Sequence, residues 1–144
     1  MAAQFIQMNV DFNAPVEEVF AQLSDHEKMG SILGAKVKRV KDGQDSVNGL
    51  GSVRRITPAP LAGFEETVTN FEPNKLVEYT ITKGSPLKNH LGRMVFNENG
   101  GKTHLHYTIQ FEPKMPVPLF GLVVKTALEK IILSGLHKLA KKYA

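Results

Sequence analysis

The C-terminal part of the chain constrains the fold most, because it carries a long amphipathic segment. Over residues 119–143, apolar residues recur every three or four positions, as they do on one face of an α-helix. The apolar arc comprises Phe120, Val124, Ala127, Leu128, Ile131, Ile132, Leu136 and Leu139, with Glu129, Lys130, His137 and Lys141 largely opposite. This pattern predicts one helix of roughly 25 residues, about 37 Å long. The three prolines in residues 113–118 cannot donate to a β-ladder, so this segment is expected to be a crossover into the helix.

The rest of the chain is typical of β-strands. In residues 6–12, Ile6, Met8, Val10 and Phe12 alternate with polar residues, which predicts a strand with one buried face. Turn-forming pairs such as Asp42-Gly43 and Asn99-Gly100 then divide the chain at short intervals. We expect further strands near residues 35–41, 51–57, 64–71, 76–83, 88–97 and 103–112, about seven in all with the first.

Two short helices are expected after the first strand. Asn13 is a candidate N-cap, Pro15 suits the first turn, and Glu17 and Glu18 lie where the helix dipole favours anions. An apolar stripe follows, formed by Val16, Val19, Phe20 and Leu23, and residues 24–34 loosen into short turns. The expected fold is therefore α+β: a single domain over residues 1–144 in which a curved antiparallel sheet wraps around the long helix. Such a sheet coils, and the space between sheet and helix can then hold a small ligand.

Composition excludes several classes of site. The chain has no cysteine, so it has no disulfide, thiolate zinc site or cysteine nucleophile. Neither a signal-peptide pattern nor a membrane-spanning stretch is apparent, and a cytoplasmic location is expected by default. The net charge of +4 is small and scattered, so no nucleic-acid partner is expected. Phosphate-loop, dinucleotide and nucleophile-elbow motifs are absent from the sequence, and no cofactor is expected.

An ion pair across two neighbouring predicted strands is the first candidate site. Arg54 is in phase with Ile56, and Glu66 is in phase with Val68, on neighbouring predicted strands. The pair is either a structural one on a solvent-exposed face or one that orients the carbonyl or carboxylate of a ligand. Arg55, on the opposite face, is the alternative to Arg54.

Other polar residues also fall in phase with apolar neighbours. Tyr79 and Tyr107 are expected to point inward, where each hydroxyl bonds either a ligand or a core group. His90 is in phase with Gly92, Met94 and Phe96, and it is either a satisfied core histidine or the best available general acid or base.

Two groups of basic residues complete the candidates. His104 and His106 alternate with inward-facing residues, but no third ligand occurs at recognisable spacing, so no metal site is expected. The last helical turns carry Lys138, Lys141 and Lys142, which either complement the helix dipole or contact anionic lipids or an acidic partner transiently.

Several short motifs resemble those of one protein family along nearly the whole chain. They are Phe12 to Phe20 (FNAPVEEVF), Gly49 to Arg54 (GLGSVR), Glu66 to Val68 (ETV) with Phe71 to Pro73 (FEP) and Leu76 to Tyr79 (LVEY), and Gly100 to Thr103 (GGKT) with Leu105 and Tyr107. In order and spacing the chain resembles the START-like superfamily, also called SRPBCC, in its polyketide cyclase/dehydrase-like branch. The resemblance implies the helix-grip fold of the birch-pollen allergen, with a cavity between sheet and long helix for lipids, polyketides or other hydrophobic molecules. Members include carriers, receptors and aromatase/cyclases, so the resemblance does not imply one reaction.

The favoured function is non-catalytic binding or transport of a small hydrophobic or amphipathic ligand, lipid- or polyketide-like. Arg54, Glu66 and His90 are the candidate polar anchors, and the apolar or aromatic wall comprises Tyr79, Met94, Phe96, Tyr107, Leu128 and Ile132. One alternative is a cyclase- or dehydratase-type enzyme in which His90 or Glu66 moves protons and Arg54 holds an oxyanion. Another is a module that binds a protein partner through the outer face of the sheet or through residues 113–118.

Overall fold

The chain folds into a seven-stranded antiparallel sheet with a long C-terminal helix, as a computed structural model of residues 3–58, 63–114 and 118–144 describes. The strands are β1 (Gln4–Phe12), β2 (Lys36–Lys41), β3 (Val53–Thr57), β4 (Phe64–Glu72), β5 (Leu76–Lys83), β6 (Leu87–Asn99) and β7 (Lys102–Pro113). The helices are α1 (Val16–Ser24), the 3-10 turn η1 (His26–Lys28), α2 (Gly30–Leu33) and α3 (Phe120–Lys141). The predicted α+β helix-grip fold is confirmed. Part of the predicted crossover, residues 115–117, lies outside the described residues.

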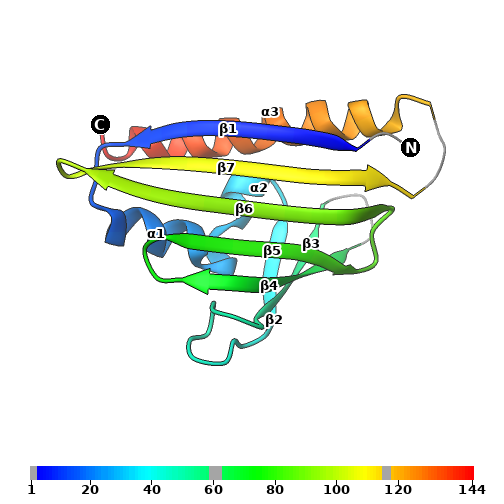
Figure 1. Cartoon of the computed structure of the whole chain (residues 1–144), viewed down its shortest axis with the longest axis horizontal. Helices are drawn as coiled ribbons and strands as arrows, with labels where there is room; N and C mark the ends of the chain where they lie inside the picture. The colour runs from blue at the N-terminus through cyan, green and yellow to red at the C-terminus, as the bar shows by residue number, and fades with distance from the viewer. Residues whose placement is uncertain (1–2, 59–62, 115–117) are drawn as a thin grey trace.

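The sheet order follows the chain except at one edge. Strands β2 to β7 form a meander, and β1 pairs with β7, giving the order β1-β7-β6-β5-β4-β3-β2 (Figure 1). The long pairings of β7 with β1 and β6 hold one side of the sheet together. Period-two patterns form these strands: in β7, Leu105, Tyr107, Ile109 and Phe111 are all buried, whereas the residues between them are half-buried or exposed.

The pairing between β5 and β6 is short. Only four residue pairs join them, from Leu76↔Val95 to Tyr79↔Gly92. Beyond Gly92 the backbone of Asn89 turns left-handed, with φ 51°, and the register of β6 against β7 shifts between Lys88 and Leu91. The main-chain ladder between β5 and β6 thus stops short of this β-bulge, at the end of the sheet where α3 begins.

The start of α1 differs from the expected one. Its N-cap is Pro15 and not Asn13, and no side chain of the cap accepts a helix amide. Instead Glu98 at the end of β6 accepts the Val16 N–H at 2.6 Å. A distant carboxylate thus replaces the local cap, which the sequence around Asn13 could not reveal. The two short helices after the first strand are as predicted.

Helix α3 packs unevenly along its length. It runs along β1 and contacts β1, β7 and α2 (Figure 1). Its C-terminal half buries Ile132, Gly135, Leu136 and Leu139, but its N-terminal half buries only Gly121. A Cβ on Gly135 would lie 2.5 Å from the Ile32 carbonyl oxygen, so glycine permits the close approach of α2. Ile131 is 44% exposed, although the pattern predicted it in the apolar arc. None of the helices in the described part of the chain has the length and apolar character needed to cross a membrane.

Candidate functional site

A buried polar cluster lies on the inner face of the sheet, where five adjacent strands each contribute one side chain. They are Arg54 of β3, Glu66 of β4, Tyr79 of β5, His90 of β6 and Tyr107 of β7, and all five are buried. The alternation of each strand directs these residues inward beside apolar neighbours. The sequence pattern had singled out the same five residues as candidates.

Arg54 and Glu66 form a buried ion pair across β3 and β4. They are direct partners in the register, and Arg54 Nε donates to Glu66 Oε1 at 2.9 Å. Arg54 Nη2 lies 2.7 Å from the same oxygen, but outside hydrogen-bond geometry, and has no hydrogen-bond partner among the described residues. Arg55 is half-buried on the opposite face and lies 3.7 Å from Glu65. The guanidinium in the interior therefore belongs to Arg54.

The two tyrosines complete this part of the cluster. The Arg54 guanidinium carbon lies 4.7 Å from the centroid of the Tyr79 ring, and the Tyr79 hydroxyl is hydrogen-bonded to that of Tyr107. Burial raises the pKa of Tyr107 to about 12 and that of Tyr79 well above its usual value. Burial alone would lower the pKa of Arg54, but the Glu66 carboxylate outweighs it and the pKa is raised. At neutral pH the tyrosines are therefore neutral and Arg54 is charged.

His90 is held by the backbone of the neighbouring strand. Its Nδ1 accepts the Ile81 N–H at 3.1 Å, so the proton of the neutral ring is assigned to Nε2, which lies 3.9 Å from Glu66 Oε2. Burial lowers the pKa of His90, and Arg54 adds to this while Glu66 opposes it. The neutral ring thus has one nitrogen engaged and the other protonated. Neither nitrogen is free to act as a base in this arrangement.

His26 joins the cluster from η1, and sequence reasoning missed it. It is 2% exposed, and its Nε2 lies 2.7 Å from the hydroxyl of Ser52, which is also buried. Its Nδ1 has no partner within the described residues. Burial lowers the pKa of His26 to about 3, with Arg54 and Arg39 contributing. No local pattern marks this residue, because its environment depends on the packing of η1 beside β2 and β3.

The apolar candidates occupy different depths. Met94, Phe96 and Ile132 are buried, whereas Leu128 is half-buried and packs against the edge of the core. Phe96 packs edge-to-face on Phe20 of α1, with ring centroids 5.0 Å apart. Phe96 is thus part of the packed core at the α1 end. Leu128 belongs to the N-terminal half of α3, which is the less buried half.

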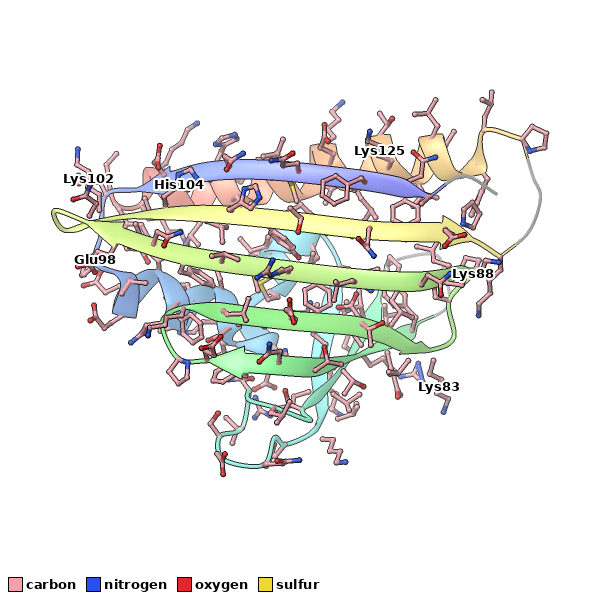
Figure 2. The ribbon with its side chains drawn as sticks, in the orientation of Figure 1. Lys83, Lys88, Glu98, Lys102, His104 and Lys125 are labelled. Atoms are coloured by element: carbon pink, nitrogen blue, oxygen red, sulfur yellow. The ribbon has the colours of Figure 1, made fainter. Side chains whose placement is uncertain are left out.

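The remaining candidates lie at the surface. His104, labelled in Figure 2, contacts Asp11 at 2.7 Å and Asn9 at 3.0 Å, and His106 contacts the same Asn9 oxygen at 2.8 Å. Within residues 3–58, 63–114 and 118–144, no group of three or more histidines and carboxylates is arranged to hold a metal ion. The three candidate lysines at the end of α3 are exposed: Lys138, Lys141 and Lys142.

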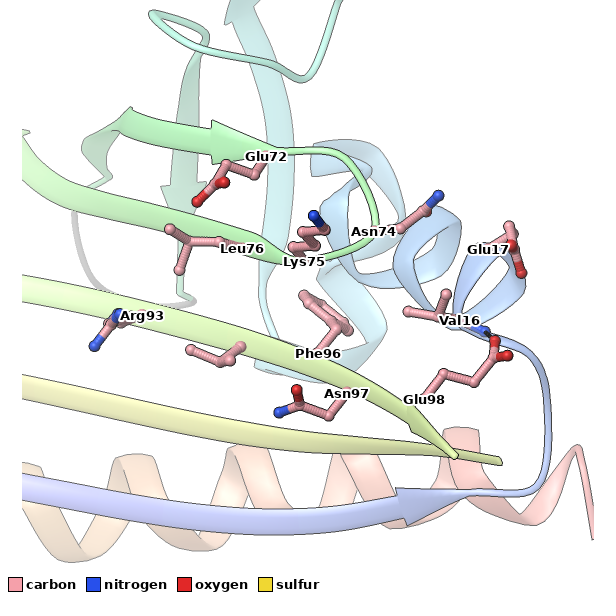
Figure 3. Close-up of a pocket in the computed structure, with 11 residues that line it drawn as sticks. Val16, Glu17, Glu72, Asn74, Lys75, Leu76, Arg93, Phe96, Asn97 and Glu98 are labelled. Carbon is pink, nitrogen blue, oxygen red and sulfur yellow. Dashed lines mark hydrogen bonds between the residues drawn. The ribbon is translucent and has the colours of Figure 1, made fainter. Parts of the chain in front are cut away.

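Two hollows lie outside the cluster. A groove of about 500 Å³ runs between α1, the β4–β5 turn and β6 (Figure 3). Its charged side chains are Glu17, Glu72, Glu98, Lys75 and Arg93, so it suits neither an apolar ligand nor an ion of one sign. A smaller hollow of about 180 Å³ lies between α2 and the end of α3. The polar cluster belongs to neither hollow.

The cluster as a whole is electrically balanced. Arg54 offsets Glu66, and the depressed pKa values of the two histidines and the raised pKa values of the two tyrosines keep those groups neutral near pH 7. A balanced set of this kind can hydrogen-bond a neutral polar group without leaving a buried charge unpaired. It has little capacity to compensate an ionised one.

Comparisons with known proteins agree with this architecture. The profile of a family described as polyketide cyclase / dehydrase and lipid transport matches residues 4–144. No curated protein matches the sequence. A START superfamily protein from Mycobacterium smegmatis has a TM-score of 0.78 at 17% identity, with 97% of this chain and 99% of that chain covered.

Two further solved structures are similar. Norcoclaurine synthase from Thalictrum flavum, in complex with dopamine and hydroxybenzaldehyde, has a TM-score of 0.71 at 13% identity, covering 99% of this chain and 89% of that one. Ara h 8.0201 has a TM-score of 0.70 at 13% identity, with coverages of 98% and 99%. At these identities the likeness establishes a shared fold.

Proposed function

Because the chain belongs to the polyketide cyclase / dehydrase and lipid transport family, we propose that it binds a small hydrophobic or amphipathic ligand between its sheet and α3. The START-like resemblance noted in the sequence is thereby confirmed. The uneven packing of α3 is the observation that carries the proposal. Val124 and Leu128 remain half-buried over the core, although the same helix is firmly packed from Ile132 onward. An apolar guest beside these side chains would complete their burial.

The charge balance of the polar cluster narrows the ligand class. Glu66 already neutralises Arg54, so an ionised head group would enter the interior without a counter-charge, at a cost of several kcal/mol. A carbonyl or hydroxyl oxygen could accept from Arg54 Nη2 without that cost. We therefore favour a ligand with an apolar body and a neutral hydrogen-bonding group.

Binding without turnover fits the cluster better than catalysis. Glu66 accepts a hydrogen bond from Arg54, and the unprotonated Nδ1 of His90 accepts one from the Ile81 N–H. A cyclase- or dehydratase-type enzyme would need one of these two groups to accept a proton from the ligand. That alternative predicts chemical change of the bound molecule, which a carrier does not produce.

The expectations from the sequence about location, domain organisation and partners stay predictions. They are the cytoplasmic location, the single domain, a partner-binding surface on the outer face of the sheet, and transient membrane contact through Lys138, Lys141 and Lys142. None of these is needed for ligand binding in the interior.

A displacement assay tests the proposal. A neutral fluorescent probe such as N-phenyl-1-naphthylamine is bound first, and 2-dodecanone and dodecanoate are then compared as competitors at neutral pH. The ketone is expected to displace the probe, and the carboxylate is expected to be weaker. Leu128→Gln, in the half-buried stripe of α3, should weaken ketone binding about tenfold, because a leucine contact of one to two kcal/mol is lost.

Leu122→Gln is the matched control, because it changes an exposed leucine of the same helix. Failure of both competitors and of the probe to bind would refute ligand binding in the interior. Mass spectrometry of the ketone recovered after incubation is expected to show it unchanged. Loss of water from a hydroxyketone substrate, abolished by His90→Gln, would instead favour the enzyme.

A further inference from the structure

The first turns of α3 present an apolar surface to solvent. Leu119, Leu122 and Val123 are 71%, 51% and 63% exposed, and we call these three residues the helix-start surface. Gly121 faces the opposite way: a Cβ there would lie 3.1 Å from the Gln4 side chain and 3.2 Å from that of Pro113. The sheet therefore holds this end of the helix through Gly121, and the three large apolar side chains are directed away from it.

The start of α3 lacks the features that usually stabilise a solvent-exposed helix N-terminus. Its first turn contains no acidic residue, and no side chain caps it. Leu119 at the N-cap has a left-handed backbone with φ 64°, which is uncommon for a bulky residue. Large exposed apolar side chains that gather at one place usually mark a binding surface.

The segment that carries the helix-start surface also contains two lysines, Lys114 and Lys125. Between Lys114 and Leu128 the sequence contains no acidic residue, and Lys125 lies one turn from Leu122. Lys88 is on the neighbouring strand, opposite Glu112, whose carboxylate accepts a hydrogen bond from Asn89 at 2.7 Å. Lys88 and Lys125 lie in the half of the molecule where α3 begins (Figure 2). The segment that carries the apolar side chains is therefore positively charged, with Lys114 and Lys125 and no carboxylate between Lys114 and Leu128.

We propose that the helix-start surface docks on an anionic lipid bilayer, with Leu119, Leu122 and Val123 inserted among the lipids. Lys114 and Lys125 would then lie at the level of the acidic head groups. Apolar side chains rimmed by lysines are typical of segments that lie in a membrane interface. Lysine is depleted in protein–protein interfaces, which favours lipid over a second copy or another protein as the occupant.

This surface is distinct from the ligand site and from the C-terminal lysines. Lys138 and Lys141 lie in the last turn of the same helix, five turns away, and no exposed large apolar residue accompanies them there. Leu128 faces the core, so its loss should affect the ligand and spare the membrane. The two ends and the two faces of α3 can thus be tested separately.

Vesicle co-sedimentation tests the proposal with the full chain. The vesicles are of phosphatidylcholine alone or of equal parts phosphatidylcholine and phosphatidylserine. The protein is expected to bind the mixed vesicles more tightly, and Leu122→Ser with Val123→Ser should lower that affinity about tenfold or more. Lys125→Gln should lower it about fivefold at low salt and less at high salt, as expected for one lysine near an anionic surface.

Two controls accompany these variants. Leu50→Ser changes an exposed leucine elsewhere, and a triple glutamine variant at positions 138, 141 and 142 removes the C-terminal charges. Both should bind vesicles like the unchanged protein, and circular dichroism checks that every variant is folded. Absence of binding to the mixed vesicles, or loss of binding only in the triple variant, would overturn the proposal. So would a concentration-dependent dimer that Leu122→Ser and Val123→Ser dissolve, because a second copy would then cover the surface.

Discussion

Replacement of Gly92 by alanine should disrupt the centre of the polar cluster. Gly92 is the direct cross-strand partner of Tyr79, whose ring lies over it. A Cβ at Gly92 would be 2.1 Å from Tyr79 Cζ, so the ring must retreat by about 1.3 Å to reach an ordinary contact of 3.4 Å. The ring is not free to do so, because its hydroxyl bonds Tyr107 and Arg54 lies against its face.

The expected loss follows from three contributions. Overpacking of a core position costs about 1–3 kcal/mol. Unpaired buried hydroxyls add about 1–3 kcal/mol, and the lost cation–π contact adds about 1 kcal/mol. Together these give about 3–7 kcal/mol, a large part of the 5–15 kcal/mol typical of a domain. At roughly 3 °C per kcal/mol for a chain of this length, Tm should fall by about 9–21 °C.

Urea unfolding followed by circular dichroism measures this loss. Gly100→Ala is the control, since nothing lies within 4 Å of a Cβ there and only the left-handed φ of 62° opposes the change. It should cost about 1 kcal/mol. Tyr79→Leu removes the ring, so Gly92→Ala should be much less harmful in that background. An unfolding free energy for Gly92→Ala within about 1 kcal/mol of the unchanged protein, or strict additivity with Tyr79→Leu, would refute this account of the cluster.

Three further predictions concern charge and protonation. Glu66→Gln should cost about 3–5 kcal/mol of unfolding free energy because Arg54 is left unpaired, and the double variant Arg54→Met with Glu66→Leu should recover most of it; equal losses in both variants would contradict this. His26 has a folded pKa of about 3 against an ordinary 6.5, so the unfolded chain binds the proton first: stability is complete above about pH 6.5 and falls toward pH 3 by up to about 1.4 kcal/mol per pH unit. His26→Asn should flatten this slope in acid urea titrations, and an unchanged slope would exclude His26 as its source. Tyr107, with its pKa raised to about 12, stabilises the fold below pH 10 and progressively less toward pH 12; phenolate absorbance and unfolding should show this alkaline loss reduced in Tyr107→Phe.

Much of the fold could be predicted because the strands follow period-two burial. In β1 and β7 every second residue is buried, and the predicted bounds agree with the observed strands to within a few residues. The same phase placed Arg54 opposite Glu66 and directed Tyr79, His90 and Tyr107 inward, as observed. Short-range patterns suffice where a residue's environment is decided by the face of its own strand.

The features that were missed depend on contacts between distant parts of the chain. The first amide of α1 is bound by Glu98, which is far away in sequence. The prediction of Asn13 as the N-cap was therefore wrong. Helix α3 buries Gly135 against α2 and leaves Ile131 exposed, and its helical periodicity alone does not reveal which apolar positions α2 covers. His26 is buried against Ser52 by the docking of η1, and nothing in its own turn marks it.

The ladder between β5 and β6 has four residue pairs, as many as join β3 to β4, and it ends at Tyr79↔Gly92. We call this short β5–β6 ladder the seam. Past the seam, the Thr80 hydroxyl donates to the His90 carbonyl and the His90 ring accepts from Ile81, so side-chain bonds replace the main-chain ladder. Because a side-chain bond can break without unravelling a strand, we expect any local opening of the sheet to start at this end of the seam.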